Sequence, residues 1–96
     1  MARVELSARA VENLTRLIET SDLPADTRER VKASLRPLAR FPLAGVHLEG
    51  RWDGFRFVLG PRRWMILVHA YLEDEQRVVV VTIRDGRTAE ATTERP

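Results

Sequence analysis

The first twenty residues predict a short strand followed by a helix. Val4 and Leu6 alternate with charged residues over 2–6, which is the period of a strand. Ser7 is suited to cap the next element. A helix is expected over 8–20, because its apolar residues recur at helical spacing and form one stripe. The residues of this stripe are Ala10, Val11, Leu14, Leu17 and Ile18.

A second helix is predicted over 25–36, after the break that Pro24 and its neighbours make in the pattern. Pro37 either ends or kinks this helix, because a proline disfavours helical geometry in the residue before it. The connector over 36–52 is rich in proline and glycine and allows a short extended piece at 46–48. The residues expected to point inward from this part of the chain are Val31, Leu35 and Leu38.

Three consecutive strands are predicted over 55–59, 63–72 and 77–84, joined by two tight turns. The complete order is β-α-α-β-β-β. Such an order indicates an α+β fold, in which two amphipathic helices pack on one face of a mostly antiparallel four-stranded sheet. We expect one domain over 1–87 and a flexible tail over 88–96, where apolar periodicity is absent.

Alternation along the strands predicts which residues face the helices. On the strand over 63–72, the wholly apolar set is the better candidate to pack under the helices: Trp64, Ile66, Val68, Ala70 and Leu72. The set expected to face solvent or a ligand is Arg63, Met65, Leu67, His69 and Tyr71. On the strand over 77–84, the expected inward set is Val79, Val81 and Ile83.

These faces predict a cluster of arginines on the side of the sheet without helices. Arg56, Arg63 and Arg84 would come from three neighbouring strands, with His69 and Tyr71 close by. Neighbouring strands lie about 5 Å apart, so the cluster would span one or two phosphates. Arginine binds phosphate through paired, charge-assisted hydrogen bonds.

Composition narrows the classes of protein and of site. The net charge is +2 and the sequence pI is about 9.9, since 15 of the 16 basic residues are arginine. Cysteine is absent, which excludes disulfides and thiolate metal sites and favours a cytoplasmic location. His47 has no second histidine at metal-ligand spacing, so neither a metal nor a cofactor is expected. The apolar runs are too short to cross a membrane.

The element order and one short motif resemble the RelE/ParE superfamily of bacterial toxin–antitoxin toxins. The motif is aromatic-Arg-x-x-x-Gly-x-x-Arg, which runs here from Phe55 to Arg63 and precedes an apolar strand. The strand over 78–83 and the basic segment over 84–87 also fit, so the resemblance covers almost the whole of 4–88.

The resemblance implies a toxin that is neutralised by a cognate antitoxin. One branch of the superfamily cleaves mRNA on the ribosome by metal-independent transesterification, and the other inhibits DNA gyrase. For the nuclease branch, the resemblance implies catalytic roles for Arg56, Arg63 and Arg84, with His69 or Tyr71 as proton carriers. Arg62 and Arg87 would bind RNA phosphate.

The chain departs from the nuclease pattern at its C-terminal end. Nucleases of the family carry a further arginine or histidine and a tyrosine there, and the stretch over 88–94 has neither. Three functions stay open: an mRNA endonuclease that inhibits translation, a ParE-like gyrase inhibitor without nuclease chemistry, and a degenerate member that is not toxic.

Overall fold

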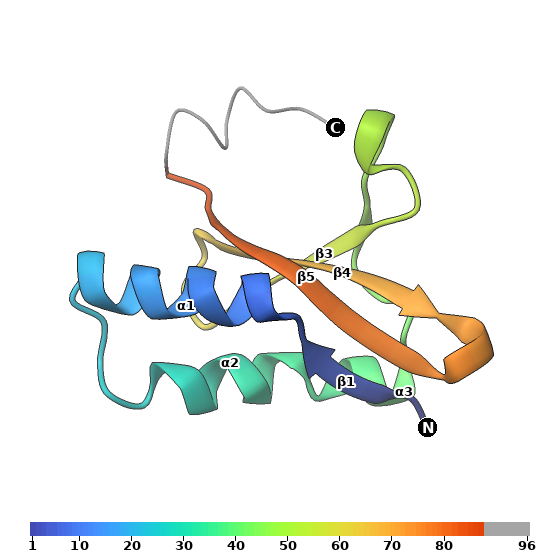
Figure 1. Ribbon diagram of the computed structural model, residues 1–96, viewed down its shortest axis with the longest axis horizontal. Helices are drawn as coiled ribbons and strands as arrows, with labels where there is room; N and C mark the ends of the chain where they lie inside the picture. Colours follow the sequence, from blue (N-terminus) through green and yellow to red (C-terminus); the bar gives the residue numbers. More distant parts are fainter. Residues whose placement is uncertain (88–96) are drawn as a thin grey trace.

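The computed structural model describes residues 1–87 as a mixed five-stranded sheet with its helices on one side (Figure 1). The strands are β1 (Arg3–Leu6), β2 (Val46–His47), β3 (Arg56–Leu59), β4 (Met65–Leu72) and β5 (Arg77–Asp85). The helices are α1 (Ala8–Thr20), α2 (Thr27–Leu35) and α3 (Pro37–Arg40), and the 3-10 turns are η1 (Gly50–Trp52) and η2 (Glu73–Glu75). The expected flexible tail lies outside the described residues.

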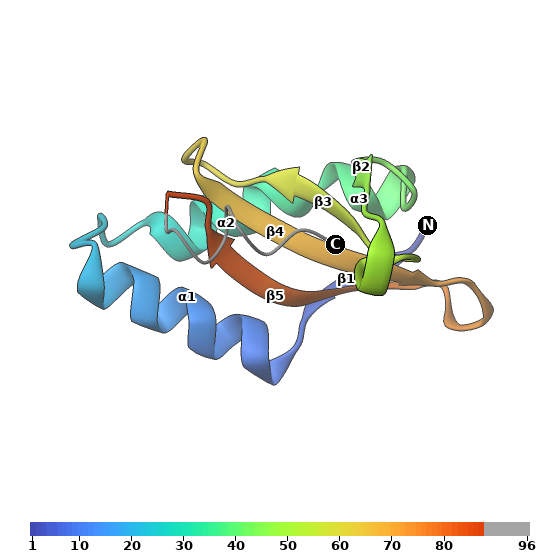
Figure 2. The same ribbon diagram turned by 90° about the horizontal axis from the view of Figure 1, so that it is seen from above.

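The sheet has the strand order β1-β5-β4-β3-β2 (Figure 2). β1 pairs with β5 in parallel, and the other three pairs are antiparallel. The expected α+β architecture is therefore confirmed in outline, but the count of four strands is wrong. The additional strand β2 coincides with the short extended piece expected at 46–48, and with only two residues it is too short to count as a strand of the sheet from the sequence.

The helix predictions hold with small changes at the ends. α1 has the predicted bounds, and the Ser7 hydroxyl accepts a hydrogen bond from the Ala10 backbone N–H, as expected of an N-cap. α2 ends at Leu35, and Pro37 begins the separate helix α3. A proline fits that first position because its missing N–H would have no helical partner there.

The core lies between the helices and one face of the sheet. Its helical part comes from Ala10 and Leu14 of α1 together with Val31, Leu35 and Leu38, all of which are buried. The inward direction predicted for the last three residues is confirmed. Val11 was assigned to the same apolar stripe, but its side chain is 48% exposed.

The predicted faces of β4 are inverted, and so are those of β5 over 78–81, whereas Ile83 points inward as predicted. Met65 and Leu67 have no exposed surface and belong to the core cluster, as do Val78 and Val80 of β5. The set that contains Ile66 and Val68 lies on the opposite, helix-free face. β4 is the middle strand, and its residues are largely apolar on both faces, so a period of two does not indicate which face meets the helices.

A bulge in β5 interrupts the alternation as well. Val68 pairs with Thr82 while His69 pairs with Val80, which leaves Val81 without a partner on β4. The extra residue lets Val80 and Ile83 both point into the core, although they are three positions apart.

α1 protects the edge of β5 at the bulge, beyond the point where β1 ends. The side-chain carbonyl oxygen of Asn13 accepts the Ile83 backbone N–H at 3.1 Å and the Thr82 hydroxyl at 2.8 Å. The Ser7 hydroxyl donates to the Val81 carbonyl at 3.1 Å. These bonds satisfy strand groups that would otherwise have no partner in the sheet.

None of the described helices is long and apolar enough to span a membrane.

Candidate phosphate-binding site

Four of the predicted arginines are carried by two segments that meet at one end of the sheet. Met65 pairs with Asp85, and the Gly86 N–H donates to the Trp64 carbonyl at 2.6 Å, so the turn before β4 meets the end of β5. The arginines carried by these two segments form what we call the arginine end: Arg62, Arg63, Arg84 and Arg87. Neither Arg62 nor Arg63 has a side-chain hydrogen bond or ion pair within the described residues, and both are exposed.

Arg87 is held in place by three neighbours. Its guanidinium lies 3.7 Å from the centre of the Trp64 ring and makes a paired contact with the Asp85 carboxylate, at 3.1 and 3.0 Å. A third bond, of 3.3 Å, reaches the Ser21 hydroxyl at the end of α1. The pKa of Asp85 is lowered, chiefly by the hydrogen bond from the Arg87 side chain, so this carboxylate stays ionised and keeps the guanidinium oriented.

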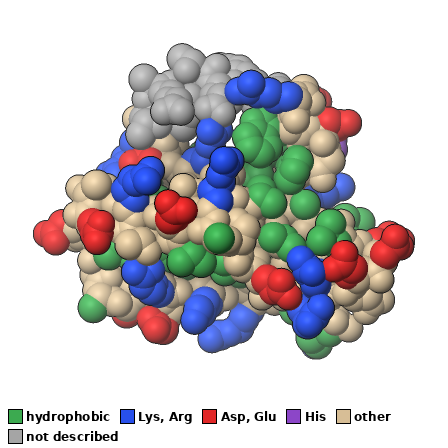
Figure 3. All heavy atoms as spheres, in the orientation of Figure 1, with side chains coloured by type: hydrophobic (Ala, Val, Ile, Leu, Met, Phe, Trp, Pro, Cys, Tyr) green, Lys and Arg blue, Asp and Glu red, His purple; other side chains and the backbone are tan. Residues whose placement is uncertain are grey.

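Arg84 occupies the helix-free face near this end. It lies opposite Ile66 in the β4–β5 register, and residues opposite one another in an antiparallel pair share a face. Its guanidinium is 5.5 Å from the centre of the Trp52 ring. In Figure 3, basic side chains lie beside an apolar patch in the upper part of the molecule, away from the helices.

Arg56 does not join this group. It lies opposite His69, four residues along β4 from Met65, which corresponds to about 13 Å of strand. Because His69 is a core residue, Arg56 projects from the helix-side face, whereas Arg84 projects from the other. The predicted cluster of Arg56, Arg63 and Arg84 is therefore wrong as a set, because the inverted faces separate Arg56 from the other two.

His69 is also in a different environment from the one predicted. Its side chain has no exposed surface, and neither ring nitrogen has a hydrogen-bond partner among the described residues. Burial lowers the pKa of His69, and the positive charge of Arg56 lowers it further. A backbone group of Ala44 raises the pKa of His69, but it does not form a hydrogen bond with the ring. The imidazole is therefore neutral near pH 7 and has no access to a ligand.

Tyr71 packs against the core as well, opposite Val78 in the register. The second histidine, His47, is in β2, where its Nε2 lies 3.4 Å from the Asp53 carboxylate. The two histidines of the chain are thus both away from the arginine end. The described residues contain no group of three acidic or histidine side chains that could hold a metal ion. The chemistry available at the arginine end is the binding and charge stabilisation of phosphate.

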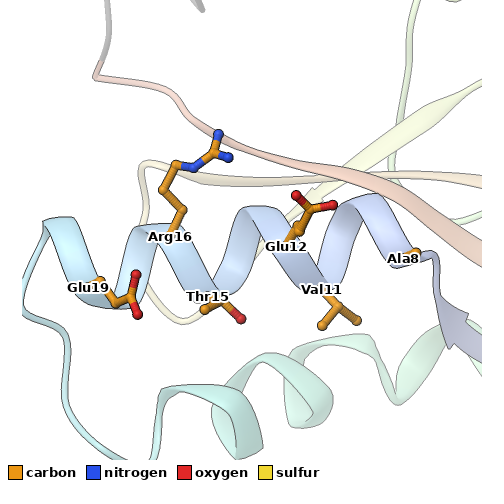
Figure 4. Close-up of a pocket in the computed structure, with 6 residues that line it drawn as sticks. All are labelled: Ala8, Val11, Glu12, Thr15, Arg16 and Glu19. Carbon is orange, nitrogen blue, oxygen red and sulfur yellow. The ribbon is translucent and has the colours of Figure 1, made fainter.

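A hollow on α1 is a weaker candidate for this chemistry. It has a volume of about 570 Å³, and Figure 4 shows that all the residues that line it come from this helix: Ala8, Val11, Glu12, Thr15, Arg16 and Glu19. Two carboxylates against one guanidinium make it unfavourable for phosphate.

Sequence reasoning missed two contacts of the site region. Trp52 had no assigned face, and its contact with Arg84 depends on the turn η1, which no periodic pattern predicts. Asn13 lies outside the apolar stripe predicted for α1, and nothing in its spacing indicates a bond to β5.

Comparison with known proteins finds similarity in structure alone. No family model matches the chain, and no curated protein sequence does. Solved structures match nearly the whole molecule. The isolated RelE toxin from E. coli is 18% identical, with a TM-score of 0.66, and the match covers 98% of this chain and 94% of that one.

Two toxin–antitoxin structures give similar values. The RelBE2 complex from Mycobacterium tuberculosis matches at 20% identity and a TM-score of 0.61, covering 88% of this chain and 90% of that one. The ParDE system from P. aeruginosa matches at 11% identity and a TM-score of 0.67, covering 88% and 96%. The chain therefore has the fold of RelE and ParE toxins, as the resemblance predicted.

Proposed function

We propose that this chain is the toxin of a type II toxin–antitoxin pair, with a cognate antitoxin as its partner. The support is the fold, which this chain shares over most of its length with an isolated RelE toxin and with chains of two toxin–antitoxin systems. The arginine end gives such a toxin a surface for an anionic target. A charge of +2 is modest, so the grouping of the arginines carries the argument more than their number.

The activity that this surface supports best is cleavage of mRNA on the ribosome. In such a reaction the 2′-hydroxyl gives its proton to water as its oxygen attacks the adjacent phosphorus. The bond to the 5′-oxygen breaks, this oxygen takes up a proton from water, and a 2′,3′-cyclic phosphate forms. Arg62, Arg63, Arg84 and Arg87 would hold the phosphate and stabilise the charge that develops on its oxygens. Since the pKa of arginine is far above neutrality, the rate would depend on charge stabilisation and on positioning.

Inhibition of DNA gyrase, without nuclease chemistry, is the second candidate. The observation that favours it is the inward direction of His69 and Tyr71, the two side chains expected to carry protons. An arginine surface without a proton carrier is still suited to bind an acidic protein face or a DNA backbone.

Controlled expression of the full chain in a bacterial host distinguishes these functions. The nuclease proposal predicts growth arrest together with transcripts cut within codons, as mapped by sequencing of 5′ ends. Gyrase inhibition predicts arrest with intact transcripts and with DNA breaks trapped on gyrase. If folded protein accumulates and growth continues unchanged, the toxin proposal fails and the degenerate, non-toxic function remains.

A further inference from the structure

Trp52 is a large aromatic residue that the fold holds outside its core. Its ring meets the Phe55 ring edge to face, with centroids 5.5 Å apart and planes inclined at 79°. The Arg84 guanidinium lies 5.5 Å from the ring centre. Neither aromatic residue belongs to the core cluster or packs directly against it. Trp52 and Phe55 both keep part of their surface exposed.

The position of Trp52 relates it to the arginine end. η1 projects from the side of the sheet opposite α1 and α2, as the yellow-green turn at the upper right of Figure 1 shows. Arg84 lies on the same helix-free face and precedes Arg87 by three residues. A polymer that contacts the arginine end with its phosphates would thus place its neighbouring unit beside the Trp52 ring.

The rest of this face is apolar and partly open. Phe57 lies opposite Val68 and Leu59 opposite Ile66, and the Leu59 side chain is 48% exposed. Arginines beside exposed rings are the combination with which proteins bind single-stranded nucleic acid, because phosphates pair with the cations and bases stack on the rings.

We propose that Trp52, supported by Phe55 and Arg84, is a stacking platform for a base of single-stranded RNA. The inference rests on the proposed function as far as RNA is the target, and it adds a recognition role for a residue outside the arginine end. The indole ring supplies one stacking surface, and the Arg84 guanidinium, which lies over the ring, offers a second plane on which a base can stack. The platform recognises the base as a flat ring, so it binds bases with little sequence preference.

Two synthetic RNAs of equal length test this proposal on the purified full chain. One is an ordinary single-stranded oligonucleotide, and the other is an abasic analogue with the same number of phosphates. The wild type is expected to bind the ordinary strand more tightly. Trp52→Ala should weaken that binding by about 5- to 150-fold and should leave binding of the abasic strand unchanged. Phe41→Ala, at a ring that is 60% exposed beside α3, is the matched control and should change neither.

The fluorescence of Trp52 gives a second measurement, in which the Trp52 side chain itself is kept. The chain has two tryptophans, so a Trp64→Phe background leaves Trp52 as the sole reporter. The ordinary strand should quench its emission, and the abasic strand should not. Trp52→Leu keeps an apolar side chain on Phe55 and should lose the preference for the ordinary strand while unfolding at an unchanged temperature.

Each outcome separates this inference from the proposed function. Equal binding of both strands by the wild type and by Trp52→Ala overturns the platform and leaves RNA as a target. Binding of neither strand by the wild type overturns the platform and leaves the proposed function to the growth experiment. A preference for the ordinary strand that disappears in Trp52→Leu supports the platform, even if expression of the chain does not arrest growth.

Discussion

His69 is a histidine without exposed surface in the middle of the central strand β4. Room for its ring depends on Gly45, where a Cβ would lie 3.2 Å from the His69 Nε2 and 2.6 Å from the Phe57 carbonyl oxygen. Gly45 also has a φ of +107°, which side chains rarely allow. The imidazole is therefore buried beside Gly45 of the connector and contributes to packing. Protonation of the ring is disfavoured there.

This position predicts a dependence of stability on pH. The unfolded chain takes up a proton at His69 near the ordinary pKa of 6.5, but the folded chain resists it because the folded pKa is lower. The free energy of unfolding should thus fall as the pH drops below 6.5, with a slope of at most about 1.4 kcal/mol per pH unit. Urea unfolding between pH 7 and pH 5 measures this slope.

Two variants assign the slope to His69. His69→Leu should remove most of it, and His47→Gln, at the exposed second histidine, should leave it as it is. Arg56→Gln should make the slope shallower, because it removes one of the two causes that lower the pKa of His69. An unchanged slope in His69→Leu would contradict this explanation.

Among the larger elements, α1 and β5 are joined at the bulge by the side chain of Asn13 together with that of Ser7. Asn13 accepts two hydrogen bonds at the bulge, one of them from the Ile83 backbone N–H. Asn13→Ala leaves that partly buried N–H without a partner and should lower the free energy of unfolding by about 1–3 kcal/mol. Glu12→Ala, at the exposed neighbouring position, should change it by less than about 0.5 kcal/mol. If urea unfolding shows equal effects of the two substitutions, the Asn13 hydrogen bonds do not stabilise the contact between α1 and β5.

The arginine end predicts how RNA binding depends on salt. Four phosphate contacts give a slope of about −3 for log K against log[salt] on a single strand. Arg62→Ala combined with Arg63→Ala should make the slope shallower by about 1.4. Arg9→Ala with Arg16→Ala removes the same charge from exposed positions on α1 and should leave the slope unchanged. Fluorescence anisotropy at several salt concentrations measures both, and matching slopes for the two double variants would contradict the assignment.

The elements themselves could be predicted from the sequence more fully than their faces. Ser7 and the apolar spacing of α1 define that helix, and the turns on both sides of β4 define the strands. The inward face of β4 could not be predicted, because Met65 and Ile66 are equally apolar and the bulge at Val81 breaks the period of β5. The predicted inward face is the wholly apolar set, and the other set contains polar side chains such as that of His69, which the fold nevertheless buries.

Features of the candidate site that follow from the order of the strands could be predicted from the sequence. Features that depend on which face of the sheet a side chain projects from could not. Arg62 and Arg63 precede β4, and Arg87 follows β5, so the antiparallel pairing alone brings them together. The face of Arg56 depends on register, and the contact of Trp52 depends on an irregular turn. Sequence patterns contain little information about either.

At the scale of the whole molecule, the structure combines a toxin fold with a basic surface at one end of its sheet. The three RelE and ParE structures compared above are at most 20% identical to this chain. The fold is therefore shared, although few of the residues are the same. The parallel pairing of β1 with β5 places the first strand beside the last. Function would then depend on the residues at the arginine end.

Growth of a bacterial host that expresses the chain from a controlled promoter tests whether the arginine end is needed for toxicity. We expect the wild type and the Arg9→Ala/Arg16→Ala control to arrest growth, and Arg62→Ala/Arg63→Ala, at equal levels of folded protein, not to do so. Arg62 and Arg63 are exposed and have no side-chain partner among the described residues, so their loss should not affect folding. Arrest of equal strength by both double variants would contradict the claim that the arginine end is the toxic surface.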